Sequence, residues 1–202
     1  MWCLPARDDE DALAGAWRAA QPFPHLVLDG FVDGGALPRL FELLEEEPVD
    51  PYEGDLFRFE ASAPEPRTAA LCELRDSFAA ALAPRLSRIT GQHVRRADMR
   101  AYAYRPGHYL LPHTDHQEGL GRALAFAYYL PSPEPPAGGE LELFRCGTSG
   151  GELREIVSTE SARLVEPRGN RLVVFDVSDV SLHQVREVLD GLRISLAGWF
   201  YP

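Results

Sequence analysis

The feature that most constrains how this chain can fold is a change of sequence texture at Gly91. Before Gly91 the apolar residues recur mainly at helical spacing. After it, short runs rich in β-branched and aromatic residues alternate with Gly, Pro and Asp turn signals. We expect strands at residues 94–104, 109–112, 123–130, 141–144, 163–165, 172–176, 183–188 and 193–200. Eight short strands after a helical half predict an α+β fold, a double-stranded β-helix (jelly roll, cupin-like) braced by N-terminal helices.

The helical half is expected to span about residues 1–92 and to support a jelly-roll core at about 93–202. A leucine pattern predicts a helix that starts at Asp33 or Gly34 and is stopped by Pro48. A longer helix is expected over 68–90, and Pro84 should kink or divide it. Residues 17–29 are expected to form a connection leading into a strand at 26–28, and 55–59 to form a further strand. A chain of 202 residues fits a single domain.

The composition excludes several classes of partner. The net charge of -11 argues against nucleic acid, because phosphate binding needs a basic surface. No apolar run approaches the ~18 residues of a membrane span, and no basic segment precedes an apolar one at the N-terminus. We therefore expect no membrane association and no secretory signal. Three cysteines without metal spacing indicate reduced thiols and a cytoplasmic protein, whose oligomeric state stays open.

The candidate metal ligands are His113 and Asp115, separated by Thr114, and the distant His183. Alternate residues of a strand share a face, so His113 and Asp115 can point inward together, and closure of the sheet would bring His183 to them. Two imidazoles and one carboxylate with open coordination positions are the ligand set of non-haem Fe(II) oxygenases. A His-x-Asp pattern with a distant His is weak evidence by itself.

Arg193 strengthens the interpretation of this ligand set. It opens the apolar run Ile194–Phe200, where a buried guanidinium needs a specific partner, and Ser195 follows on the same strand face. A guanidinium binds a carboxylate in a bidentate manner, so Arg193 is suited to the far carboxylate of a dicarboxylate cosubstrate. Together these residues indicate an Fe(II)- and 2-oxoglutarate-dependent dioxygenase that uses O2.

Several longer segments resemble a known family. Residues 104–115 (YRPGHYLLPHTD), 122–130 (RALAFAYYL) and 138–141 (GGEL) resemble the prolyl hydroxylase branch of the 2-oxoglutarate oxygenases. Residues 181–188 (SLHQVREV) and 193–200 (RISLAGWF) are similar to the catalytic domain of the ribosomal prolyl 3-hydroxylases. Residues 55–59 (DLFRF) and the helix after them resemble the N-terminal half of that group. The similarity covers most of the chain and is most specific in its C-terminal half.

The resemblance implies an activity and further site residues. It implies hydroxylation of an unactivated C–H bond of a peptidyl proline, in a ribosomal protein, with release of succinate and CO2 and with ascorbate as a supporting reductant. Tyr104 and Tyr129 match tyrosines that hydrogen-bond 2-oxoglutarate, Arg193 matches the residue that pairs with its distal carboxylate, and Ser195 is expected to assist. The catalytic set is the metal-ligand set, His113, Asp115 and His183, and Asp115 speaks against the halogenating subgroup.

Two other functions stay open from the sequence alone. One is an oxygenase of the same chemistry that acts on a free amino acid or another small metabolite. The other is a barrel that binds metal or 2-oxoglutarate without oxidising anything, as a sensor or an inactive homologue. The segment 49–66 is the candidate lid, and Tyr52, Phe57 and Arg58 are the candidate substrate contacts.

Overall fold

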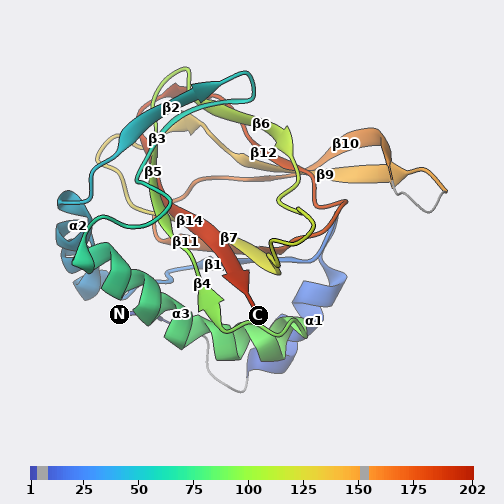
Figure 1. The fold of residues 1–202 in the computed structure, drawn as a ribbon, viewed down its shortest axis with the longest axis horizontal. Helices are drawn as coiled ribbons and strands as arrows, with labels where there is room; N and C mark the ends of the chain where they lie inside the picture. Colours follow the sequence, from blue (N-terminus) through green and yellow to red (C-terminus); the bar gives the residue numbers. More distant parts are fainter. Residues whose placement is uncertain (4–8, 151–154) are drawn as a thin grey trace.

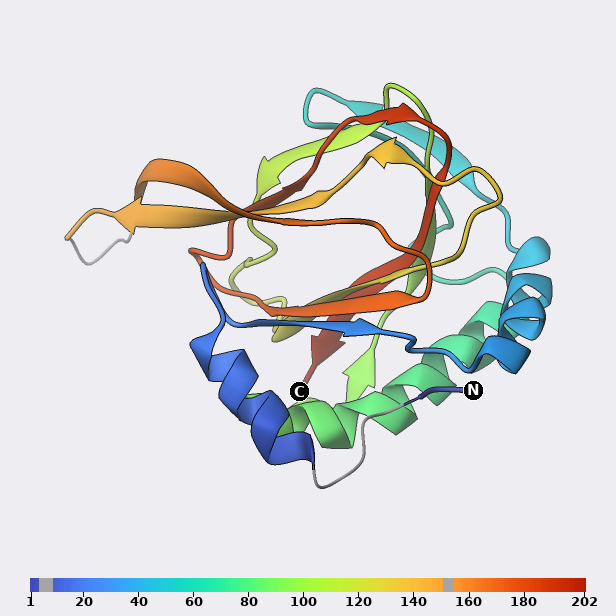
Figure 2. The same cartoon turned by 180° about the vertical axis from the view of Figure 1, so that it is seen from behind.

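A strongly curled antiparallel sheet forms the body of the protein, and the helices lie against one side of it (Figures 1 and 2). The computed structural model describes residues 1–3, 9–150 and 155–202. Its helices are α1 (Glu10–Ala19), α2 (Leu37–Glu45), which follows the 3-10 turn η2 (Gly34–Ala36), and α3 (Ala69–Thr90). Its strands are β1 (His25–Asp29), β2 (Asp50–Gly54), β3 (Phe57–Ala61), β4 (Arg96–Ala97), β5 (Arg100–Tyr104), β6 (Tyr109–His113), β7 (Leu124–Tyr129), β8 (Ala137–Gly138), β9 (Leu141–Thr148), β10 (Ile156–Val165), β11 (Arg171–Asp176), β12 (His183–Val185), β13 (Val188–Asp190) and β14 (Arg193–Tyr201).

The order of the strands explains the curl. Hydrogen-bonded neighbours run β1-β11-β7-β14-β5-β3-β6-β12-β9-β10, with β2 added to β3 and β4 added to β14. The first half of this path faces the second half, and β3 joins the two because it pairs with both β5 and β6. This arrangement confirms the predicted jelly roll with supporting helices. The interior between the two halves is where a ligand can bind.

Alternation along β7 assigns its two faces to different layers. Leu124, Phe126 and Tyr128 pack outward with the helices, while Ala125 and Ala127 point to the interior. The outer face therefore forms the main core, in which Phe78 of α3 contacts the rings of Phe126 and Phe200 at 4.7 and 5.6 Å. Burial of this apolar layer holds the sheet in place beneath the cavity.

Helix α3 shows how local signals fix an element. The Thr68 hydroxyl accepts a hydrogen bond from the Leu71 amide at its start, and Gly91 ends it with a left-handed backbone conformation. Leucines and Phe78 at helical spacing supply the face that packs on the sheet. The helix runs without interruption through Pro84, so the expectation that this proline divides it was wrong. Packing along the rest of that face outweighs the one hydrogen bond that proline removes.

The expected boundaries of several strands need correction. The strand expected over 94–104 is two strands, β4 and β5, because the Asp98 carboxylate between them accepts hydrogen bonds from the Trp199 amide and the Tyr201 hydroxyl. The strand expected over 183–188 is likewise divided into β12 and β13. Strand β10 covers Ile156–Val165, well beyond the expected 163–165. Its exposed, weakly patterned residues gave little sign of a strand.

Two N-terminal elements were also missed. Residues 10–19 form α1, which is attached to α3 through the Glu10 carboxylate, the acceptor of bonds from Arg85 and Arg88 at 2.7 Å each. Residues 50–61 form the β2–β3 hairpin rather than a loop ending in a strand at 55–59. The candidate lid at 49–66 is therefore largely a hairpin built into the curled sheet.

Candidate metal centre and cosubstrate cavity

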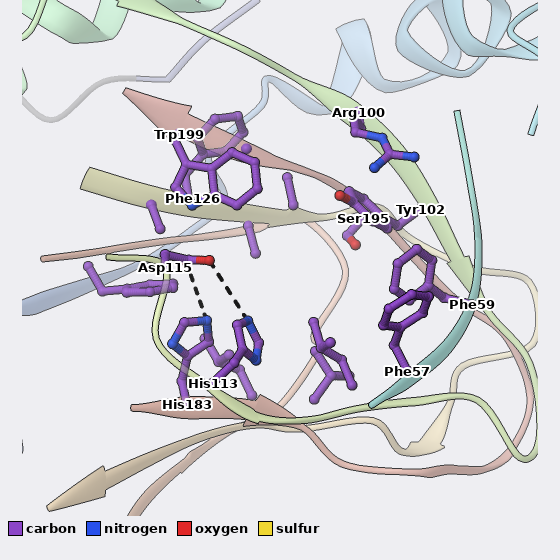
Figure 3. A pocket seen from close by; sticks show the side chains of 18 of the residues that line it. Phe57, Phe59, Arg100, Tyr102, His113, Asp115, Phe126, His183, Ser195 and Trp199 are labelled. Carbon is purple, nitrogen blue, oxygen red and sulfur yellow. Dashed lines mark ion pairs between the residues drawn. The ribbon is translucent and has the colours of Figure 1, made fainter. Parts of the chain in front are cut away.

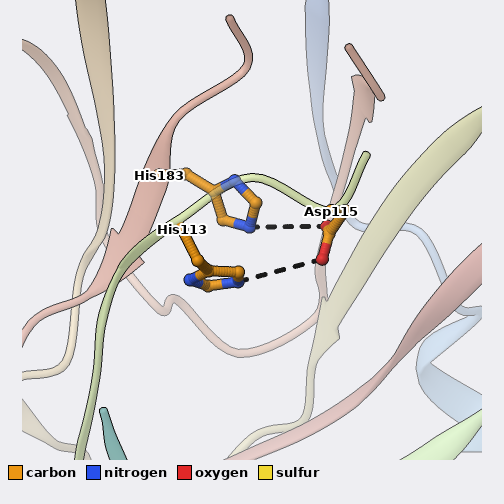
Figure 4. Close-up of side chains that lie close together, drawn as sticks. All are labelled: His113, Asp115 and His183. Carbon is orange, nitrogen blue, oxygen red and sulfur yellow. Dashed lines mark ion pairs between the residues drawn. The ribbon is translucent and has the colours of Figure 1, made fainter. Parts of the chain in front are cut away.

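His113, Asp115 and His183 meet at the open end of the interior. His113 ends β6 and His183 begins β12, and the two residues are direct antiparallel partners. They are thus neighbours in one half of the sheet, and closure of a barrel is not needed to bring them together. Asp115 lies two residues beyond β6 and turns its carboxylate toward both rings (Figure 4). One potential ligand atom from each residue lies within 4.8 Å of the others.

Hydrogen bonds hold the two imidazoles in one orientation. Nδ1 of His113 donates to the Leu111 carbonyl at 2.8 Å, and Nδ1 of His183 donates to the Ser181 carbonyl at 2.9 Å. With the proton on Nδ1, Nε2 of each ring faces the Asp115 carboxylate, at 3.8 and 3.5 Å. Burial lowers the pKa of His183 to about 4, against the opposing effect of Asp115. His183 is therefore neutral at physiological pH, as a metal ligand must be.

The residues present fit a divalent iron ion. Asp115 and His183 are 7 and 5% exposed, while the His113 side chain keeps 27% of its surface accessible, so the cluster has an open side. Two neutral imidazoles and one carboxylate match the ligand set of non-haem Fe(II) sites. The separation of 3.5–3.8 Å between imidazole nitrogens and carboxylate oxygens is too long for direct hydrogen bonds, as expected of groups that converge on an ion.

A cavity of about 350 Å³ is lined by these ligands and by Arg193. Figure 3 shows His113, Asp115 and His183 on one side of it, with Ser195 and Tyr102 on the other. Arg193 begins β14 and is 4% exposed; its guanidinium lies over the rings of Tyr104 and Tyr129, at 4.7 and 4.9 Å. It donates to the Ser195 hydroxyl at 3.2 Å. The Nε of Arg193 and the hydroxyl of Tyr129 are buried and have no hydrogen-bond partner within the described ranges. Such orphaned groups fit a bound carboxylate.

Small side chains make room for the ligand. Strand register places Ala197 of β14 between Arg100 of β5 and Ala127 of β7, and Ala125 is next along the same face. These residues line the cavity, whereas larger side chains on the opposite face of β7 pack against the helices. Gly139 has a similar role beside Arg193, because a Cβ there would come within 3.1 Å of the arginine side chain.

Two cavity-lining arginines were missed in the sequence. Arg100 stacks on Tyr52 and Tyr102, and Arg122 lies 3.6 Å over the Trp199 ring and donates to the Asp115 carbonyl. The signal that could have identified them is the alternation of side chains along a strand. Arg100 and Tyr102 share a strand face with Tyr104, and Trp199 shares one with Arg193. The register that aligns these faces could not be inferred from the sequence.

The candidate substrate contacts are placed differently from one another. Phe57 lines the cavity, and its ring packs against Phe59. Tyr52 lies behind that wall, stacked on Phe59 and under the Arg100 guanidinium. The side chain of Arg58 is half exposed and lies 3.9 Å from Glu53, outside the cavity. Their roles remain predictions, as do those of Tyr104, Tyr129 and Ser195.

Comparison with known proteins identifies one family. The family model described as "2OG-Fe(II) oxygenase superfamily" matches residues 99–201. Among curated proteins, prolyl 3-hydroxylase OGFOD1 of Xenopus laevis is 35% identical over 95% of this chain and 40% of its own length. Prolyl 3-hydroxylase OGFOD1 of Mus musculus is 34% identical over 89% of this chain and 33% of its own length. The chain thus spans well under half the length of these relatives.

Solved structures support the fold. A Pseudomonas putida prolyl-4-hydroxylase superposes with a TM-score of 0.68 at 20% identity, covering 94% of this chain and 98% of that one. A prolyl hydroxylase of Trichoplax adhaerens, in complex with a hypoxia-inducible-factor peptide fragment, gives 0.67 at 14% identity, with 96 and 90% coverage. At these identities the likeness concerns the jelly roll alone.

Proposed function

This chain belongs to the 2OG-Fe(II) oxygenase superfamily, and from that membership we propose that it is a prolyl hydroxylase acting on a proline within a peptide or protein. One observation carries the oxygenase assignment. A buried guanidinium without a carboxylate partner in the described residues, that of Arg193, shares a cavity with the three metal ligands. The prolyl hydroxylases among the relatives support the choice of substrate.

The site residues have separate roles in the proposed reaction. His113, Asp115 and His183 would hold Fe(II), and Arg193 with the Ser195 and Tyr129 hydroxyls would bind the far carboxylate of 2-oxoglutarate. The bound iron and cosubstrate supply oxidative decarboxylation to succinate and CO2 and the insertion of one oxygen atom into a C–H bond. The protein itself fixes the tautomer of both imidazoles, orients the cosubstrate along the alanine-lined floor and limits access of water. No side-chain base or nucleophile is needed.

The cavity also supports a peptide substrate. Phe57, Phe59 and Leu110 form an apolar wall of the cavity, against which a proline ring can pack. A ribosomal protein is the substrate that the sequence resemblance favours. We further propose that the protein works in the cytoplasm, which agrees with its three free cysteines. No helix in the described part of the chain is long and apolar enough to cross a membrane.

Succinate formation tests this proposal. The purified protein, loaded anaerobically with Fe(II), is given 2-oxoglutarate, O2 and ascorbate, with and without a peptide from a proline-bearing loop of a small-subunit ribosomal protein. The proposal predicts peptide-stimulated succinate and a mass gain of about 16 Da on the peptide, the mass of one inserted oxygen. A peptide with alanine in place of the proline is the matched control.

Two other results would contradict the proposal in different ways. Slow succinate formation that the peptide does not change, with no mass gain, would keep the oxygenase and favour a free amino acid or another small metabolite. No succinate from protein with bound iron would favour a sensor or inactive homologue. The Asp115→Ala variant should form none, because its metal site lacks the carboxylate.

A further inference from the structure

Arg100 is a second arginine of the cavity, half-buried, and the chemistry proposed above does not use it. It lines the cavity from β5, on the same strand face as Tyr102 and Tyr104. Figure 3 shows Arg100 across the pocket from His113 and Asp115, beside Tyr102 and Ser195. Strand register sets Arg100 opposite Ala197 of β14, whose small side chain also lines the cavity.

The contacts of Arg100 hold its side chain but leave one buried nitrogen without a hydrogen-bond partner in the described residues. Nε donates to the Ser62 carbonyl at 2.8 Å, and the guanidinium carbon lies 4.9 and 5.3 Å from the ring centres of Tyr52 and Tyr102. The Nη2 atom is buried and has no hydrogen-bond partner in residues 1–3, 9–150 and 155–202. A buried donor on a cation is costly to leave unpaired, so this atom indicates a missing acceptor.

The charges of the cavity identify the acceptor as an anion. Arg100, Arg122 and Arg193 all line it, and none forms an ion pair with a carboxylate of the described chain. Asp115 is the acidic residue among the lining side chains. Fe(II) and 2-oxoglutarate, once bound, would cancel each other's formal charges, so an excess of positive charge would remain. A negatively charged substrate group would offset it.

We propose that Arg100 is a specificity-determining residue that binds a carboxylate of the substrate close to the carbon that is hydroxylated. This inference rests on the proposed oxygenase function and narrows its substrate class. The carboxylate can belong to an Asp or Glu side chain beside the proline of a peptide, or it can be the α-carboxylate of a free or C-terminal proline. Tyr52 and Tyr102 hold the planar guanidinium in one orientation, which favours bidentate binding of a carboxylate.

Paired probes distinguish the two sources. Binding to protein loaded with Mn(II) and 2-oxoglutarate is measured by calorimetry for a blocked peptide with aspartate after its proline and for the same peptide with asparagine. L-proline and L-prolinamide form the second pair. We expect the acid to bind about tenfold or more tightly than the amide in one pair, as a charge-assisted bond should give. The pair of probes that shows this ratio identifies the source of the substrate carboxylate, either a peptide side chain or the α-carboxylate of proline.

Substitutions of Arg100 test whether this residue causes the difference in affinity between acid and amide. Arg100→Met keeps the length of the side chain and should reduce the ratio to about twofold or less, and Arg100→Lys, which keeps the charge without the fork, should be intermediate. Arg96→Met is the matched control, because Arg96 also stacks on a tyrosine, Tyr201 at 4.1 Å, but lies outside the cavity. It should leave the ratio unchanged. If Arg100→Met does not fold, Arg100→Lys carries the test.

Three results would overturn the assignment: equal binding of acid and amide in both pairs, an unchanged ratio in the folded Arg100 variants, or no binding of any probe. Succinate formation by the same wild-type preparation tests the proposed oxygenase separately. Succinate without a carboxylate preference would refute only the role of Arg100. A carboxylate preference without succinate would refute the oxygenase while retaining the binding site.

Discussion

Replacing Arg193 by methionine should weaken 2-oxoglutarate binding without unfolding the protein. In the wild type Arg193 is 4% exposed, and within the described residues its guanidinium forms one hydrogen bond, to Ser195, besides its contacts with two tyrosine rings. Burying an unpaired cation costs several kcal/mol, which the hydrogen bond (~1 kcal/mol) and two cation–π contacts (~1–2 kcal/mol each) roughly offset. Since the cost and the contacts disappear together, we expect the free energy of unfolding of the ligand-free variant to lie within about 1–2 kcal/mol of wild type.

The effect on the cosubstrate should be larger. Losing a charge-assisted pair with a carboxylate costs ~1.5–3 kcal/mol, so the Kd for 2-oxoglutarate should rise roughly 10- to 100-fold. At a concentration 100 times the wild-type Kd, 2-oxoglutarate stabilises the wild type by ~2.7 kcal/mol, or roughly 5–10 °C in Tm for a chain of this size. The variant should gain only about 0.4–1.4 kcal/mol at that concentration.

The assay is thermal unfolding followed by circular dichroism, with Mn(II) present and with or without 2-oxoglutarate. Ser195→Ala is the conservative comparison in the same cavity. It removes one 3.2 Å hydrogen bond to Arg193 and leaves the charge in place, so the shift with 2-oxoglutarate should fall less than in the Arg193 variant. A variant that loses more than ~3 kcal/mol of stability yet keeps the full shift with 2-oxoglutarate would refute the reasoning. Arg193 would then be a structural residue, and the cosubstrate would bind elsewhere.

Three further predictions follow from the described contacts. Asp115→Ala should abolish the rise in Tm that Mn(II) gives the wild type, because two imidazoles alone bind the ion weakly. Thermal unfolding measures the rise in Tm, and a calorimetric titration measures the affinity for Mn(II). Tyr129→Phe removes a buried hydroxyl without a partner in the described chain, so it should raise the KM for 2-oxoglutarate about tenfold while the ligand-free Tm stays unchanged or increases. Arg88 and Arg85 lower the pKa of Glu10 to about 2, so this carboxylate stabilises the fold above its ordinary pKa and loses that contribution as pH falls toward 2. Glu10→Gln should therefore flatten the fall in Tm between pH 5 and 2 in an acid titration, and an unchanged slope would show that the pair does not stabilise α1 on α3.

The sequence predicted the parts of the site whose residue types are chemically restricted. His113, Asp115 and His183 form the ligand set of non-haem Fe(II), and Arg193 opens an apolar strand, where a buried cation needs an anionic partner. It also predicted the central strands, since β7 and β11 are buried and rich in β-branched or aromatic residues. These signals are local, so they can be recognised in the sequence without knowing which strands are neighbours.

What the sequence did not reveal depends on long-range register. Arg100 and Arg122 are ordinary arginines until strand pairing sets the first opposite Ala197 and brings the second over Trp199. Helix α1 is held by ion pairs to α3, with Glu10 and Arg88 being 78 residues apart in the chain. The β2–β3 hairpin has a polar first strand, which its pairing with Phe57–Ala61 stabilises.

The two faces of β7 and β14 explain why the fold tolerates, in its interior, arginines that have no carboxylate partner among the described residues. On the outer face Phe126, Tyr128 and Phe200 are at most 2% exposed, and each contributes roughly 2–3 kcal/mol of apolar burial against α3 and its neighbours. On the inner face of the same strands lie alanines and Arg193, whose unpaired charge costs several kcal/mol. Because side chains alternate, the layer that stabilises the sheet is separate from the layer that binds ligands. Carboxylates that bind these arginines would offset that cost, so part of it returns as affinity for the ligand.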